Sequence, residues 1–487
     1  MREMFVHALL LVLLVSFVMP VRPGVASSAQ AGGEDAVDEI IQDFEADAPA
    51  DDNLEDLMEG FEDESALGEP AVEEACGMAH VSESSSWGLD GELAFAVIHS
   101  ISSGVQSPWD GFSMVRPEFT LTLNSKFSDQ WRSKVSVRGF YDVVYSLRGR
   151  HKYTDQVLHD YEKELELKDA YVQGALKDHL DVKIGRQVVV WGGFDNLRVV
   201  DVLNPLDLRV PGLTDMDDLR LPVTAIKLDY YLAAWDLSAM AIPEVRFSKM
   251  PVYGSDFYPY AAPLPPEDEP NDGFRNVPYA ISMTGVFSGW DVGLYWADIY
   301  DDQIYLAAVA DGPPGRFSSK HARVSMLGAA GSLAVGDWLF KSEVAWIDGL
   351  HYSNTRAEAY HRLDLGAGAE YFGFKETVIC LEAVNRHIYD YDSRLQSSPD
   401  QVDRDEFQWA FRVTKDLIHD TLTLTCLIST FGVKTDNGLY ERIEAEYDVT
   451  DAVGIRAGMV FYQAGDKEWF KDVEKNDRLF VTLTYHF

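Results

Sequence analysis

The chain ends in the ten residues RLFVTLTYHF (478–487), in which apolar side chains occupy every second position. Successive side chains of a β-strand point to opposite faces, so this alternation puts an apolar stripe on one face and mostly polar groups on the other. Residues 452–463 repeat the pattern. One face of such a strand suits lipid and the other suits water, which predicts a strand of a membrane-spanning sheet.

The same pattern extends back to residue 90, as alternating runs separated by connections. Tight turns and longer polar segments follow one another, as expected of a barrel with short periplasmic turns and long external loops. The count is eighteen strands, in a range of sixteen to twenty, because residues 290–309 fit one long strand or a hairpin. A large soluble β-protein is the alternative. We expect the tight turns at 126–130, 177–178, 233–234, 288–289, 335–337, 373–375, 415–420 and 448–452.

An all-β fold is therefore predicted, namely one transmembrane antiparallel β-barrel over residues 90–487, with both termini in the periplasm. The N-terminus predicts export: an apolar run from Met4 to Met19 follows Arg2, and small residues at Ala29-Gln30-Ala31 suit signal peptidase. We interpret 1–31 as a cleaved signal peptide, with a retained anchor as the alternative. No later window approaches a membrane-spanning helix, and hydrocarbon accepts only helices or closed barrels, so the mature chain would cross as strands.

Residues 32–89 form an acidic segment that we expect to be a periplasmic arm, partly helical or disordered. The net charge of −39 is concentrated here, since no Lys or Arg occurs between Arg22 and Arg116, and it argues against a nucleic-acid partner. Two similar stretches place apolar side chains at helical spacing among the acids. They could dock on a periplasmic partner or tuck into the barrel mouth, or they could be a solvated spacer. The docking residues would be Ile40, Ile41, Phe44, Leu57, Met58 and Phe61.

The most distinctive segment is WGGFDNLRVVDVLNPLDLRV (191–210), which leaves a strand, turns at Gly192 and Gly193, and is too apolar for a free external loop. An inward loop over 189–221 is therefore predicted, with its backbone satisfied by the barrel wall. Its charges would either set ion preference at a constriction or form salt bridges that hold the loop. These residues are Asp195, Arg198, Asp201, Asp207, Arg209, Asp215, Asp217, Asp218 and Arg220.

The motifs GRQ (185–187), VWG (190–192), DVLNP (201–205) and DLRLP (218–222) resemble an uncharacterised proteobacterial outer-membrane barrel family related to alginate-export-type porins. The likeness is specific over about 165–260. It implies a barrel with an inward loop, working beside an inner-membrane exporter of the resistance-nodulation-division type. The terminal Phe487 resembles the assembly signal of outer-membrane barrels, which implies the barrel assembly machinery as a partner. The mixed charges expected in the lumen lack the basic ladder that a polyanion such as alginate needs.

No phosphate-binding loop, cysteine pair at metal spacing or nucleophile elbow occurs, so we expect no cofactor, no metal and no enzymatic activity. Alternation places Cys380 and Cys426 on opposite faces, which argues against a disulfide between them. The proline-rich loop 244–278 would stiffen an external lid, with Tyr253, Phe257, Tyr258 and Tyr260 available to stack on a sugar or an aromatic ligand.

The predicted function is a porin-like diffusion or export channel in the outer membrane of a Gram-negative bacterium, embedded in outer-membrane lipid and narrowed by the inward loop. The alternative is a plugged barrel that acts as a binding or scaffold protein for an envelope export complex. In that case the acidic arm would contact an inner-membrane exporter or a periplasmic protein.

Overall fold

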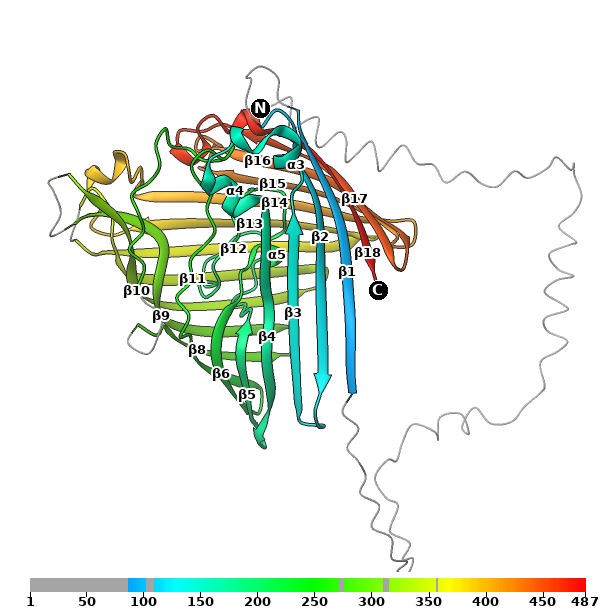
Figure 1. The fold of residues 1–487 in the computed structure, drawn as a ribbon. Coiled ribbons are helices and arrows are strands. Elements are labelled where there is room, and N and C mark those ends of the chain that lie inside the picture. Colours follow the sequence, from blue (N-terminus) through cyan, green and yellow to red (C-terminus); the bar gives the residue numbers. More distant parts are fainter. Residues whose placement is uncertain (1–85, 102–108, 271–275, 310–314, 356–357) are drawn as a thin grey trace, which may run out of the picture. The chain divides into compact units, whose positions relative to one another are not determined.

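The computed structural model describes residues 86–101, 109–270, 276–309, 315–355 and 358–487. The predicted signal peptide, nearly all of the acidic arm and its six docking residues lie outside them. The described residues belong to one compact unit and form a single antiparallel sheet of 18 strands (Figure 1). β1 pairs with both β2 and β18, so the sheet closes into a barrel and the predicted fold class is confirmed.

Each strand pairs with its neighbours in the sequence, so the barrel is an unbroken series of hairpins. The strands are β1 (Ser86–Ser100), β2 (Gly111–Lys126), β3 (Trp131–Tyr141), β4 (Lys163–Lys177), β5 (Leu180–Gln187), β6 (Val223–Leu232), β7 (Trp235–Ala241), β8 (Tyr279–Phe287), β9 (Trp290–Ala308), β10 (Phe317–Val335), β11 (Trp338–Leu350), β12 (Tyr360–Phe374), β13 (Thr377–Ile388), β14 (Asp405–Leu417), β15 (Leu422–Phe431), β16 (Leu439–Thr450), β17 (Val453–Gln463) and β18 (Arg478–His486).

Each of the eight tight turns overlaps the residues expected for it, because each separates two alternating runs. One boundary differs. β1 starts at Ser86, inside the segment assigned to the arm, because residues 86–89 pair with the end of β2. Residues 290–308 form one strand, β9, rather than a hairpin, because β10 pairs with β9 to its end.

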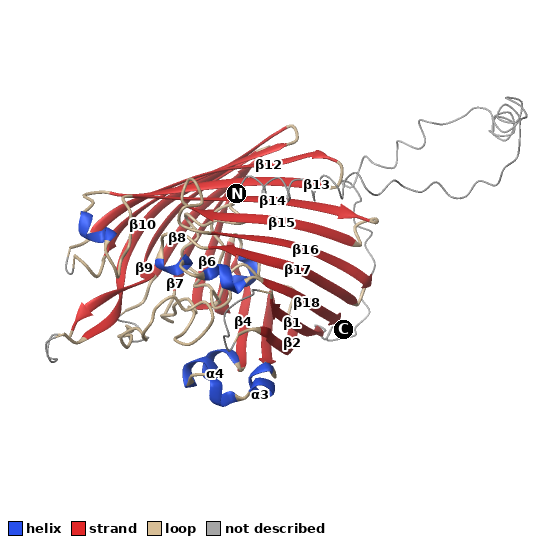
Figure 2. Ribbon diagram, turned by 90° about the horizontal axis from the view of Figure 1, so that it is seen from above, coloured by secondary structure: helices blue, strands red, loops and turns tan. Residues whose placement is uncertain are grey.

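Short helices occur in the long connections: α3 (Val144–Arg148), η1 (Arg150–Lys152), α4 (Asp155–Tyr161), α5 (Met216–Leu219), η2 (Ser393–Gln396), η3 (Glu468–Phe470) and η4 (Val473–Asn476). Both views place α3 and α4 together beside the ends of β2 and β4 (Figures 1 and 2). The Thr154 hydroxyl caps α4 by accepting the Val157 N–H at 3.2 Å. No helix of the described residues is long and apolar enough to span a membrane.

The outer face of the barrel carries large apolar side chains that are exposed around the whole ring, for example Leu93, Leu228, Leu327, Leu381 and Leu483. Aromatic rings gather where strands meet the tight turns: Trp235 and Trp290 each contact Phe287, and Trp338 contacts Tyr371. Trp109 differs from this pattern. It packs under the helical connection against Tyr145 and Tyr153 and is only 9% exposed, so it is a core residue there.

Four adjacent strands are short. β5, β6, β7 and β8 have 8, 10, 7 and 9 residues, whereas the flanking strands β4 and β9 have 15 and 19. β4 pairs with β5 only from Ala170 onward, and β9 pairs with β8 only as far as Asp298. The barrel wall is therefore shorter along these four strands, and the segments 188–222 and 242–278 leave the sheet there. They are the two long connections that build the sites described next.

Candidate constriction in the barrel lumen

The segment 188–222, which contains α5, folds into the barrel interior instead of extending away from it (Figure 1). Its apolar side chains, including Leu197, Val200 and Leu203, are buried in one cluster with inward-facing residues of β10, β11 and β13. Farther along, Leu213 packs with Ile98, Val460 and Phe480 from β1, β17 and β18. The segment therefore reaches across the lumen from one side of the wall to the other.

Glu343 of β11 fixes the first turn of this loop. One oxygen of its carboxylate accepts the Gly193 N–H at 2.7 Å and the Phe194 N–H at 3.2 Å, and the other accepts the Val200 N–H at 3.2 Å. The side chain of Glu343 is buried. A buried carboxylate that accepts several N–H groups holds them strongly, because few other partners are available to either side.

Glu382 of β13 holds the next three residues in the same way. Its carboxylate accepts the N–H groups of Asp195, Asn196 and Leu197 at 2.8, 2.9 and 3.0 Å. The two glutamates thus receive every backbone N–H from 193 to 197, so the loop tip is fixed by wall carboxylates through its main chain. This role of Glu382 was not predicted from the sequence. The sequence signal that could have indicated it is an acidic residue on the inward face of a strand, between small apolar residues.

Glycines of the wall make room for the loop. A Cβ atom at Gly366 would overlap the ring of Phe194, and one at Gly328 would lie 2.8 Å from Val200. Within the loop, Gly192 has a φ of +79°, a conformation that suits glycine, next to the Glu343 carboxylate. The close approach of loop and wall therefore depends on missing side chains on both surfaces.

The charged residues expected at the constriction are largely held in ion pairs. Arg220 pairs with Asp201 at 2.9 Å and with Asp217, while Arg198 lies 3.4 Å from Asp201. Arg209 pairs with Asp207 at 2.5 Å, also within the loop. The remaining pairs join the loop to the wall: Asp195 with Lys341 at 2.6 Å, Arg209 with Glu164 at 2.7 Å, and Asp215 with Arg442 and, at 3.3 Å, Arg412. Asp218 lines a small cavity with Arg138 and Lys168.

These contacts favour the reading in which the charges hold the loop. They also bring loop charges together with inward-facing charges of the wall, such as Arg138, Lys168 and Arg442. Two cavities remain beside the loop. One has a volume of 230 Å³ and is lined by Asp201, Arg362, Asp364 and Arg386, and the other has a volume of 50 Å³.

Asp215 should make the loop sensitive to acid. Burial alone would raise the pKa of Asp215, but the guanidinium groups of Arg442 and Arg412 outweigh it and lower the pKa. A lowered pKa means that the contact stabilises the loop at any pH above the ordinary aspartate range and is lost as the pH falls through the lowered value. Arg442 also lies 3.5 Å from Glu444, so its positive charge stays partly neutralised after Asp215 takes up a proton.

We therefore expect the Asp215→Asn variant to conduct more than the native protein from neutral pH down to about pH 4, and this difference to disappear at lower pH as Asp215 takes up a proton. Single-channel recording over this range provides the measurement. The Asp215→Asn variant is the control, since it has no proton to gain there and should show the higher conductance at neutral pH. Equal conductance of the two proteins at neutral pH would contradict this role.

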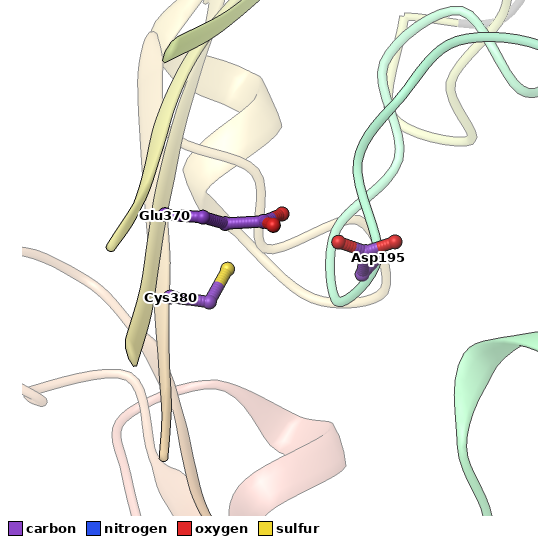
Figure 3. Close-up of side chains that lie close together, drawn as sticks. All are labelled: Asp195, Glu370 and Cys380. Atoms are coloured by element: carbon purple, nitrogen blue, oxygen red, sulfur yellow. The ribbon is translucent and has the colours of Figure 1, made fainter. Parts of the chain in front are cut away.

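Asp195, Glu370 and Cys380 form a cluster in which the possible metal-ligand atoms lie within 4.8 Å of one another. Asp195 comes from the loop and faces Glu370 and Cys380, which lie on strands β12 and β13 of the wall (Figure 3). The ammonium of Lys341, however, lies 2.6 Å from Asp195 and also contacts Glu370. One lysine ammonium thus already pairs with both carboxylates, and a metal ion would have to displace it.

A larger cavity of 1230 Å³ lies at the end of the barrel that carries the long connections. The proline-rich segment 246–267 lines it. Tyr253, Tyr258 and Tyr260 line it, as the sequence suggested for a stacking site. Phe257 does not, because it is 5% exposed and packs against Tyr462. The floor of the cavity carries a network in which Lys249 and Arg246 pair with Glu166.

Comparisons with known proteins give a family but no assigned activity. The profile of the family described as "Protein of unknown function (DUF1302)" matches residues 73–487. No curated protein matches the sequence. This supports the predicted membership of an uncharacterised barrel family, whereas the relation to alginate-export-type porins receives no support from it.

Solved outer-membrane proteins of similar fold have very different sequences. OccK9 (OpdG) of Pseudomonas aeruginosa is 12% identical with a TM-score of 0.49, over 83% of this chain and 98% of its own. The outer membrane protein opdK of the same organism is 11% identical with a TM-score of 0.49, over 82% and 99%. OccAB2 of Acinetobacter baumannii is 12% identical with a TM-score of 0.48, over 83% and 98%.

Proposed function

We propose, since this chain belongs to the DUF1302 family of proteins of unknown function, that it is a non-enzymatic outer-membrane channel narrowed by the internal loop 188–222. The observation that carries the proposal is the pair of glutamates, Glu343 and Glu382, which hold the loop tip inside a closed barrel. A segment held in this way divides the lumen into a wide cavity on one side and narrow spaces beside the loop.

A membrane location is supported by the outer surface. Soluble proteins rarely expose large continuous apolar patches, whereas here apolar side chains are exposed all round the ring. Aromatic residues at the tight-turn ends of the strands suit the boundary between lipid and water. The export signal predicted at 1–31 agrees with an outer membrane, with the tight turns and both termini facing the periplasm.

The lumen does not favour a polyanion as the permeating molecule. Its inward-facing charges have both signs and are paired with each other, as in Lys134 with Asp169, Arg138 with Glu118, and Lys227 with Asp229. A polyuronate would need an excess of free basic groups along its path. Kinship with alginate-export-type porins, and work beside an inner-membrane exporter, stay predictions drawn from the sequence motifs.

A plugged barrel that serves as a scaffold is the second candidate. It is favoured by the burial of the loop against opposite sides of the wall, which leaves less room for passage when the loop is in place. In that case the acidic arm would hold a periplasmic or inner-membrane partner. The barrel assembly machinery would insert the protein into outer-membrane lipid in either case.

Recording in planar lipid bilayers tests the proposal on the purified full-length protein. We expect discrete single-channel currents that are small for a barrel of eighteen strands, because the loop occupies the lumen. Migration of unheated and heated protein in detergent gels provides the control that the barrel is folded. A folded protein that carries no current would favour the scaffold.

A further inference from the structure

The large cavity lies where the barrel wall is shortened by the short strands β5 to β8. Residues 163–169 of β4 have no strand partner on the side of β5, and residues 299–308 of β9 have none on the side of β8. Between these two edges the wall is completed by loop segments. Arg186 reaches across the edge of β4, donating its Nε–H to the Leu167 carbonyl at 2.7 Å and pairing with Glu166 at 3.5 Å. The gap in the sheet is thus closed at its base by a side chain rather than by a strand.

The cavity passes from one face of β4 to the other. It is lined by Glu164 and Glu166, which point inward and pair with Lys249, and also by Leu165 and Leu167, which point outward. Leu165 is 72% exposed and Leu167 40% exposed, as expected of the outer face. Neighbouring residues of one strand alternate between faces, so a cavity that touches both sets must run round the free edge of the strand.

At the opposite edge of the gap, outward-facing residues also line the cavity. Ile304 of β9 and His321 of β10 are register partners, share the outward side of the sheet with Arg323 and Tyr300, and line the cavity. The ring of Phe247 stacks on His321 with centroids 3.3 Å apart. The Ser248 N–H donates to the Asp302 carboxylate at 2.8 Å. Segment 246–267 therefore reaches across the gap from the lumenal network to the outside of β9 and β10.

The base of the gap lies at the level expected for the boundary of the bilayer. Tyr279, the first residue of β8, and Trp296 of β9 border it, and both are exposed on the outer face. Tyr and Trp favour the lipid–water boundary. β5 and β7, with 8 and 7 residues, are also shorter than the 9–11 residues that a spanning strand needs. A molecule that leaves through the gap would therefore enter the outer leaflet.

The lining indicates the chemistry of such a molecule. Aromatic and proline side chains dominate the segment that covers the cavity, among them Tyr253, Tyr258, Pro263 and Pro265, with Trp469 beside them. The cavity is lined by five Lys or Arg and six Asp or Glu side chains, so its charges nearly cancel. The cations Arg186, Arg209, Arg246 and Lys249 are already paired with carboxylates of the protein. This surface favours a mainly apolar molecule without net charge.

We propose that the opening between β4 and β9 is a lateral portal through which uncharged, mainly apolar molecules pass between the large cavity and the outer leaflet of the membrane. The inference deepens the proposed channel function and rests on its membrane location. It assigns two routes to one barrel, an axial route for ions past the loop 188–222 and a lateral route for apolar solutes above the short strands.

The test uses uptake of the uncharged fluorophore N-phenyl-1-naphthylamine by porin-deficient Gram-negative cells that express the full chain. Its fluorescence rises when it enters the membrane. We expect cells with the native protein to take it up several-fold faster than cells without it. Leu165→Trp and Leu167→Trp place bulk at the lip of the portal and should lower the initial rate several-fold, whereas Phe247→Ala should raise it.

Val172→Trp is the matched control, because Val172 also faces outward on β4 but lies below the gap, where β5 is paired. Its uptake rate should equal that of the native protein. Heat-modifiable migration in gels verifies that each variant is folded and inserted. Uptake that is the same in native, Leu165→Trp, Leu167→Trp and Phe247→Ala cells would overturn the portal.

Single-channel conductance separates this inference from the proposed function. The portal variants should keep the native ionic conductance, because the lip lies outside the axial path. Portal-dependent uptake without ionic current would remove the axial channel and leave the portal standing. Ionic current without portal-dependent uptake would overturn the portal and leave the axial channel supported.

Discussion

Replacing residues 188–222 by a two-residue Asn-Gly turn is expected to raise the single-channel conductance several-fold. Gln187 and Val223 are register partners at the ends of β5 and β6, so a short hairpin turn can join the two strands without moving them. The replacement removes the segment that spans the lumen together with its buried cluster against β10, β11 and β13. Conduction through a barrel of eighteen strands should then be limited by the wall alone.

Planar bilayer recording at fixed salt measures this effect, and circular dichroism together with heat-modifiable migration shows whether the barrel has formed. The variant leaves the buried wall residues Glu343, Glu382 and Arg442 without their loop partners, so some loss of stability is expected alongside the gain in conductance. A folded variant with the native conductance would mean that the loop does not limit the axial path.

Changing Glu343 and Glu382 together to glutamine should release the loop without removing it. Each carboxylate accepts three backbone N–H groups, and an amide presents one nitrogen that cannot accept. Hydrogen bonds to charged groups contribute about 1.5–3 kcal/mol each, so loss of even a few leaves the loop tip in several positions. We expect a larger mean conductance with frequent steps between levels.

Asp181→Asn provides the matched control for this double variant. Asp181 is another inward-facing carboxylate, on β5 near a tight turn, and its side chain accepts from Tyr231 at 3.5 Å rather than from the loop. Its removal should leave the current steady. Steady native currents in the double glutamine variant, with unchanged protease resistance of the loop, would show that packing alone holds the tip.

The strands, their number and their faces could be predicted because each depends on neighbouring residues. Alternation in 478–487 is a property of consecutive side chains, and it places Val481 and Leu483 outward whatever the rest of the chain does. Cys380 and Cys426 were assigned to opposite faces on the same ground. The register agrees, since Cys380 lies beside Arg412 of the lumen whereas Cys426 lies beside Val413 and Ile443 of the outer face.

The inward course of the loop was predictable as well, because its apolar residues need burial. The partners of its charges were not. Asp215 finds Arg442 and Arg412, and Asp195 finds Lys341, across intervals of well over a hundred residues in the sequence. The stacking role expected for Phe257 failed for the same reason, since the ring that covers it belongs to Tyr462 in β17.

By itself, the sequence determined a barrel of eighteen strands, the order of its turns and an apolar loop that must be buried. Only the closed tertiary structure decided what holds that loop, since Glu343 and Glu382 lie 150 and 187 residues beyond the N–H groups of Gly193 and Asp195 that they bind. It also decided where the wall is open, because the free edges of β4 and β9 depend on the pairing register of whole strands. Local alternation determines which way a side chain points, and closure of the sheet determines what it meets.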